Sequence, residues 1–149
     1  LMMDLIEYCA RHNIDEILDL PDIKERIDLY FKYEKDFKEQ LKRCTKVIGN
    51  LLVIDYRDEE IIYPGNRFMV YAMHPEQNIS IHVIWGKDKQ NIVYSTGKSI
   101  INKSSKTNVG ELMLKYNGGG HKAAGGCQID VDKAEIVLEE LIKQINQDG

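Results

Sequence analysis

The segment that decides the fold runs from residue 78 to residue 95 and reads NISIHVIWGKDKQNIVYS. Its first eight residues alternate between two faces, with Ile79, Ile81, Val83 and Trp85 on one of them, which is the pattern of a strand buried on one side. Residues 86–89 supply a turn, and residues 91–95 return as a second strand. We therefore predict a β-hairpin, with Trp85 packed in its core and not stacked on a ligand.

Further strands and helices are predicted on both sides of this hairpin. Residues 47–56 are rich in β-branched and aliphatic side chains and are predicted as a strand, whereas residues 67–73 suit a helix or a strand equally. After the hairpin, Asn108 and Glu111 have the spacing of a capping box for a helix that continues to Tyr116. A short strand at 127–131 and a last helix, capped by Asp132 and Glu135, follow. This order predicts an α+β fold with a mixed β-sheet flanked by helices.

The first 45 residues are predicted to be helical. Asn13 and Glu16 form a capping-box pattern for a short helix over 14–18, and Pro21 suits the first turn of a longer helix that ends near Cys44. Apolar residues recur along this helix at helical spacing and the opposite face is charged, a pattern typical of a helix that packs on a neighbouring domain or subunit. We divide the chain into a helical connector, 1–45, and a domain, 46–149. Because the helical pattern begins at the first residue, we expect the chain to be a piece of a longer protein.

Composition limits the possible functions. The net charge is −4, yet residues 87–122 contain seven lysines and only two acidic residues, a local surplus of five positive charges. This surplus suits either a phosphate-facing patch or a solvated loop. The three cysteines include no CxxC pair and the four histidines stand apart, so no metal site is expected within this chain. No apolar stretch is long enough for a membrane span and no signal peptide is visible, so a cytoplasmic protein is expected.

Residues 117–126 read NGGGHKAAGG and are the strongest functional signal. Three consecutive glycines are costly to order, so a folded protein keeps them where a Cβ would collide or where φ is positive. They could end the helix in a left-handed turn, or they could present several backbone N–H groups to an anion. His121 and Lys122 come next and can donate hydrogen bonds to an anionic oxygen, which favours the anion site.

The run from Asn108 to Tyr116, followed by Gly118-Gly119-Gly120-His121 and Ala123-Ala124-Gly125, resembles the GGGH signature of the first type of DHH-associated domain. That domain forms the C-terminal part of DHH-superfamily phosphoesterases, and the resemblance covers about residues 46–146. Among those enzymes the sequence looks most similar to the exopolyphosphatase-related branch.

The resemblance implies a phosphodiesterase acting on short oligonucleotides or nucleotides, in which this chain recognises the substrate. Two divalent metal ions, usually manganese, would lie in the N-terminal DHH catalytic domain, so the isolated chain is expected to be inactive. Many relatives carry an Arg-Ser pair where this sequence has Ser95-Thr96-Gly97-Lys98-Ser99, so Lys98 is the cation nearest to that position. Lysine offers a point charge instead of the planar fork with which arginine binds a phosphate at two oxygens. The candidate substrate-binding residues are Gly118, Gly119, Gly120, His121, Lys98, Ser99, Lys103 and Lys106.

Two other functions remain open. The chain could serve mainly as a dimerisation or docking module through the long helix at 23–41, without contacting the substrate. It could also be an independent enzyme that uses His121 as an acid or base, although no partner carboxylate or nucleophile stands beside it. The sequence does not distinguish an oligonucleotide, a cyclic dinucleotide, a nucleoside bisphosphate or polyphosphate as substrate, nor does it decide whether the protein forms a homodimer.

Overall fold

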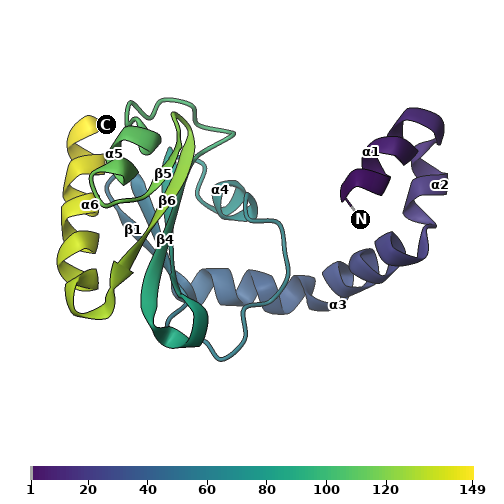
Figure 1. Ribbon diagram of the computed structural model, residues 1–149, viewed down its shortest axis with the longest axis horizontal. Coiled ribbons are helices and arrows are strands. Elements are labelled where there is room, and N and C mark those ends of the chain that lie inside the picture. The colour runs from purple at the N-terminus through teal and green to yellow at the C-terminus, as the bar shows by residue number, and fades with distance from the viewer. Residues whose placement is uncertain (1) are drawn as a thin grey trace.

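The structure is a computed structural model that describes residues 2–149, and it confirms the predicted α+β fold with a mixed sheet and flanking helices (Figure 1). The six strands lie in the order β1-β2-β3-β4-β6-β5, with β2 and β3 parallel and all other neighbours antiparallel. The strands are β1 (Thr45–Ile48), β2 (Leu51–Asp55), β3 (Ile79–Trp85), β4 (Asn91–Lys98), β5 (Gly119–His121) and β6 (Ala124–Asp130). The helices are α1 (Met2–Arg11), α2 (Ile14–Leu18), α3 (Pro21–Cys44), α4 (Met69–Met73), α5 (Val109–Leu114) and α6 (Ala134–Asp148), and the single 3-10 turns are η1 (Lys87–Lys89) and η2 (Val131–Lys133).

The predicted hairpin forms the centre of the sheet. Strands β3 and β4 pair antiparallel, from Ile79 opposite Lys98 to Trp85 opposite Ile92. The alternation of β3 is confirmed, since Ile79, Ile81 and Val83 are completely buried in one core. Trp85 is partly buried and packs against that core, and its indole Nε1 donates a 2.9 Å hydrogen bond to the carbonyl of Arg57.

The sheet has a core on each face. Helices α5 and α6 cover one face, where Tyr94, Met113 and Leu141 are buried together, while α4 and the end of α3 lie on the other (Figure 1). The second core contains Phe37 and Leu41 of α3 packed against β2. Strands β2 and β3 therefore bury apolar side chains on both faces of the sheet, which stabilises the centre of the fold.

Two local predictions need correction, and the open choice between helix and strand at 67–73 is decided. Residues 47–56 are two strands instead of one, because Gly49, at φ +62°, and Asn50 make a tight turn between β1 and β2. This turn depends on α6, since the Asn146 side-chain oxygen accepts the N–H of Asn50 at 3.1 Å. The run 67–73 contains the helix α4, and the last helix begins without an Asp132 cap because η2 precedes it and Lys133 occupies the N-cap position.

Helices α1, α2 and the first half of α3 form an arm that extends away from the sheet (Figure 1). The predicted capping box of α2 is present, with Asn13 and Glu16 exchanging hydrogen bonds of 3.0 and 3.1 Å. Helix α3 runs from Pro21 to Cys44 as predicted, and its last turns pack into the domain, so connector and sheet share a core. The division at residues 45 and 46 stays a prediction. Within residues 2–149, no helix has the length and apolar character needed to cross a membrane.

Candidate functional site

The glycine-rich segment is a β-hairpin at the edge of the sheet. Asn117 ends α5 in the left-handed conformation, with φ +57°, and the N–H of Gly118 bonds to the carbonyl of Met113 at 3.0 Å, as in a helix C-cap. The chain then forms β5, which pairs with β6 so that Gly119 faces Gly126 and His121 faces Ala124. The left-handed helix end is therefore confirmed, and the glycines that follow form an edge strand instead of a loop.

The three glycines differ in what surrounds them. A Cβ at Gly118 would lie 2.2 Å from the carbonyl oxygen of Gly126, and one at Gly120, where φ is +151°, would lie 2.4 Å from that of Ala124. Backbone atoms cannot give way by that much, so the fold requires glycine at both positions. A Cβ at Gly119 would meet no atom within 4 Å. The fold does not require glycine there, and its absent side chain leaves open space above the sheet.

His121 is exposed and its tautomer follows from its neighbour. The backbone N–H of Ala123 donates to Nδ1 of His121 at 3.2 Å. An N–H group only donates, so Nδ1 must accept, and a neutral ring in this position carries its proton on Nε2. The Nε2–H group is then the donor that the neutral ring has available.

The strand register places these residues on one side of the sheet. Two neighbouring rows of paired residues run across β4, β6 and β5. The first row contains Ser95, Gly126 and Gly119. The second row contains Gly97, Ala124 and His121. Directly opposed residues point to the same side of a sheet. We call the five residues Ser95, Gly97, Ala124, Gly126 and Gly119 the small-residue face. It lies on the same side of the sheet as α3 and α4, because Gly97 is also paired with Ser80, whose hydroxyl bonds to Tyr71 of α4.

The structure places Lys98 on the opposite side from His121. Lys98 is paired with Ile79, which points into the core under α5 and α6, and its ammonium donates to the carbonyl of Ser105 at 2.9 Å. Burial, and after it the nearby charge of Lys122, lower the pKa of Lys98.

Ser99 and Lys106, in the loop after β4, also form hydrogen bonds within the fold. The hydroxyl of Ser99 accepts the N–H groups of Ile101 and Asn102 at 3.1 and 3.0 Å, so it holds a turn. Lys103 and Lys106 are exposed, and the N–H of Lys106 bonds to the carbonyl of Gly149, beside the end of α6. Ser99 and Lys106 thus make contacts within the fold, and the contact of Ser99, Lys103 and Lys106 with a ligand stays a prediction.

Arg67 is a cation near the small-residue face that the sequence did not indicate. It precedes α4, is exposed, and its Nη2 atom lies 3.4 Å from the position of a Cβ on Gly97. It forms no ion pair with any residue from 2 to 149 that the structure describes. No spacing rule could have found it, because 30 residues separate it from Gly97 and only the packing of α4 on the sheet joins them.

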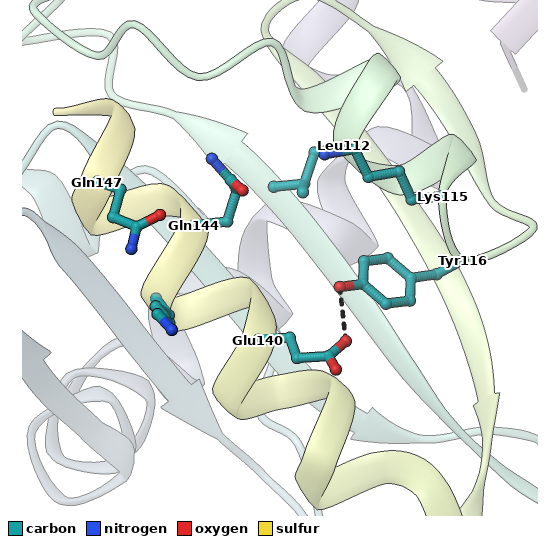
Figure 2. A pocket seen from close by; sticks show the side chains of 7 residues that line it. Leu112, Lys115, Tyr116, Glu140, Gln144 and Gln147 are labelled. Carbon is teal, nitrogen blue, oxygen red and sulfur yellow. Dashed lines mark hydrogen bonds between the residues drawn. The ribbon is translucent and has the colours of Figure 1, made fainter.

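A hollow of about 320 Å³ lies on the other side of the sheet, between α5 and α6 (Figure 2). Figure 2 shows the hydroxyl of Tyr116 pointing to Glu140, to which it donates at 2.9 Å. Burial and this carboxylate raise the pKa of Tyr116 to about 12, so the phenol keeps its proton. Lys115 and Lys143 line this hollow together with Glu140, so its lining carries a surplus of one positive charge.

No group of three or more His, Cys, Asp or Glu side chains is placed to hold a metal ion in the part of the chain that the structure describes. The donor set for a two-metal centre is therefore not found among these residues.

Comparison with known protein families identifies the part of the chain that contains the glycine-rich hairpin. Residues 65–147 match the DHHA1 domain, a stretch that includes β3 to β6, α5 and the glycine hairpin. The chain belongs to the DHHA1 domain family. This confirms the predicted resemblance to the DHH-associated domain. No protein with curated annotation matches the chain in sequence.

Solved structures extend the comparison of this DHHA1 domain. The pGpG-specific phosphodiesterase PggH from Vibrio cholerae is 60% identical, with a TM-score of 0.86, over 99% of this chain and 50% of that protein. An exopolyphosphatase-related protein from Bacteroides fragilis is 20% identical, with a TM-score of 0.54, over 79% of this chain and 37% of that protein, and it shows the shared fold. The chain thus spans about half the length of the Vibrio phosphodiesterase.

Proposed function

We propose that this DHHA1 domain binds the phosphate-containing part of a short oligonucleotide or nucleotide for a DHH-type phosphodiesterase. Hydrolysis would take place on a catalytic domain outside this chain, which would hold two divalent metal ions, manganese by family resemblance. The 60% identity to a pGpG-specific phosphodiesterase over nearly the whole chain supports this function and favours a linear dinucleotide as substrate.

The observation that carries the proposal is the open position at Gly119. Its neighbours Gly118 and Gly120 are glycines because backbone atoms occupy their Cβ positions, but Gly119 has no such reason. A bound substrate that approaches the backbone closely would supply one. His121 lies two residues further along the same strand with Nε2–H free to donate, and β5 is the edge strand, so no further strand pairs with its outer side. An anion can therefore receive hydrogen bonds from both backbone and side chain.

The chain's own residues would position the substrate and leave bond cleavage to the metal centre. Metal ions of that kind activate water and stabilise the charge of the transition state. The isolated chain is therefore expected to bind a phosphorylated ligand and to hydrolyse nothing.

Alanine substitutions at neighbouring glycines test the proposal in the full-length protein, with pGpG as the substrate. We expect Gly119→Ala to unfold at the same urea concentration as the wild type but to raise KM at least tenfold, since the new methyl group would occupy substrate space. Gly120→Ala is the matched control and should instead lower the free energy of unfolding by about 2 kcal/mol or more, because of its backbone clash and positive φ. His121→Ala should reduce turnover while leaving assembly intact.

The docking alternative makes the opposite prediction. If the domain only joins subunits, Gly119→Ala and His121→Ala leave pGpG turnover unchanged, and that result would overturn the proposed function.

The arm supports a docking role in addition to substrate binding. Several of its large apolar side chains are exposed, among them Phe31 at 66% and Ile14 at 64%. Exposed apolar side chains that gather in one patch mark a surface for another protein or domain. We propose that the arm packs against the catalytic domain and so holds the small-residue face toward the metal centre.

A further inference from the structure

A cavity of about 250 Å³ opens on the same side of the sheet as the small-residue face. Phe37, Tyr56 and Tyr63 form its aromatic walls, and Arg67, His82 and Ser95 line it with polar groups. This volume is below the range of roughly 300–1,000 Å³ that holds a whole drug-sized ligand, so it suits one ring system of a larger molecule.

The cavity walls are built closely around this space. A Cβ at Gly65 would lie 2.2 Å from the ring of Phe37, so the loop before α4 presses directly on that ring. Tyr63 is supported from outside by Tyr33, at a ring distance of 5.5 Å. Because both walls are held by their neighbours, little side-chain entropy remains to be lost when a ligand enters.

The cavity is continuous with the glycine hairpin. His82 lies opposite Ser95, Ser95 opposite Gly126, and Gly126 opposite Gly119, so one row of residues joins the cavity floor to the open position on β5. Ser95 and Gly119 are two strand spacings apart, about 10 Å. The side chains between them are hydrogen atoms or small groups, which leaves a ligand able to lie across the row.

His82 and Ser95 are the polar groups on the cavity floor, and both suit an uncharged ring better than a phosphate. Burial, and after it the charge of Arg67, lower the pKa of His82 to about 4, so its imidazole is neutral at pH 7. Its Nε2 atom is buried and has no hydrogen-bond partner among residues 2–149. A neutral floor between aromatic walls matches a nucleobase, which stacks on aromatic rings and carries its own donors and acceptors. The guanidinium of Arg67 can stack on the same base or pair with its phosphate.

We propose that this cavity is a nucleobase subsite, in which Phe37, Tyr63 and Ser95 receive one base of a short oligonucleotide whose phosphate lies at Gly119 and His121. Arg67 lines the cavity and stands over Gly97, where it binds the nucleotide that crosses from one position to the other. The inference rests on the proposed function and deepens it. A base subsite would make the protein selective for oligonucleotides over polyphosphate, which has no base.

The test compares two substrates in the full-length protein: pGpG, which has bases, and its abasic analogue, in which a hydrogen atom replaces each guanine. The quantity measured is the ratio of kcat/KM for pGpG to kcat/KM for the abasic analogue. We expect Ser95→Leu, which places a large side chain on the cavity floor, and Arg67→Gln each to lower this ratio at least tenfold. The control Lys143→Gln removes the same charge as Arg67→Gln from α6, on the other side of the sheet, and should leave the ratio unchanged.

The outcomes separate the inference from the proposed function. If Gly119→Ala impairs pGpG hydrolysis but Ser95→Leu and Arg67→Gln leave the ratio at its wild-type value, the base subsite is wrong and the phosphate site stands. If Gly119→Ala has no effect on pGpG hydrolysis, the phosphate site fails and the subsite fails with it. Should Ser95→Leu misfold, as judged by its urea midpoint, Arg67→Gln decides alone, because Arg67 is exposed and its replacement leaves the core intact.

Discussion

His82 shows at the scale of one residue how burial creates a pH-sensitive group. It lies on β3, next to Tyr56 at a ring distance of 5.9 Å, and its pKa is lowered to about 4. In the unfolded chain the same imidazole has an ordinary pKa near 6.5. Between these two values the unfolded chain binds a proton that the folded chain does not.

Stability should therefore fall as the pH falls from about 6.5 toward 4. Because unfolding takes up a proton in this window, the contribution of His82 to the free energy of unfolding is complete above pH 6.5. It decreases by at most about 1.4 kcal/mol per pH unit below that value. Urea unfolding of the wild type and of His82→Leu at several pH values from 4 to 8 measures this slope. Equal slopes for the two proteins would show that His82 is not the responsible group.

At the scale of an element, α3 holds the loop that walls the cavity. Gln40 is completely buried, and its amide nitrogen donates to Glu59 and to the carbonyl of Ile61, both at 2.6 Å. Its amide oxygen accepts the N–H of Tyr63 at 3.0 Å. Hydrogen bonds from Arg43 and then from Gln40 lower the pKa of Glu59 to about 2, so this anchor is charged at pH 7. One glutamine thus fixes the loop from residue 59 to residue 63 on the helix.

Replacing Gln40 by leucine should release this loop. We expect the free energy of unfolding to fall by about 2–3 kcal/mol, because the substitution leaves buried partners without hydrogen bonds. Amide hydrogen exchange in residues 59–63 should become faster, and the selectivity for pGpG should decrease, since Tyr63 forms a wall of the cavity. Gln147→Leu on the exposed side of α6 is the control and should change stability by less than about 0.5 kcal/mol. Unchanged exchange in residues 59–63 of Gln40→Leu would contradict the anchoring role.

At the scale of the whole molecule, the arm and the sheet domain differ in how many apolar side chains they bury. The sheet domain buries two cores of its own. In contrast, the arm has a single buried apolar side chain, Ile17, among residues 5–36, whose side chains the structure describes. The arm therefore depends on a neighbour to cover its apolar side chains. The catalytic domain proposed above would be that neighbour.

Phe31→Ser should distinguish the isolated chain from the full-length protein. In the isolated chain the ring is largely exposed, so we expect a change of less than about 0.5 kcal/mol in the free energy of unfolding. In the full-length protein the same substitution should lower the melting temperature by several degrees and reduce pGpG turnover, because it removes a contact between domains. Calorimetry of both proteins measures the difference, and equal small shifts would mean that Phe31 faces solvent in the full-length protein too.

Much of this protein follows from its sequence alone. The alternation at 79–85, the helical spacing after Pro21 and the left-handed helix end before three glycines are local signals, because strand and helix periods depend on neighbouring residues. The same local patterns identify the family, since helix, glycines and histidine are contiguous in the chain.

Only the tertiary structure decided which residues share the site. The strand register places Lys98 and His121 on opposite sides of the sheet, although Lys98 is the cation nearest in sequence to the position of the family's Arg-Ser pair. Helix α4 brings Arg67 over Gly97. The structure also shows that, of the three glycines, only Gly119 has free space at its Cβ position. The physical reason is that side-chain direction alternates at each strand residue, and that helix packing joins segments whose separation in sequence carries no information about distance.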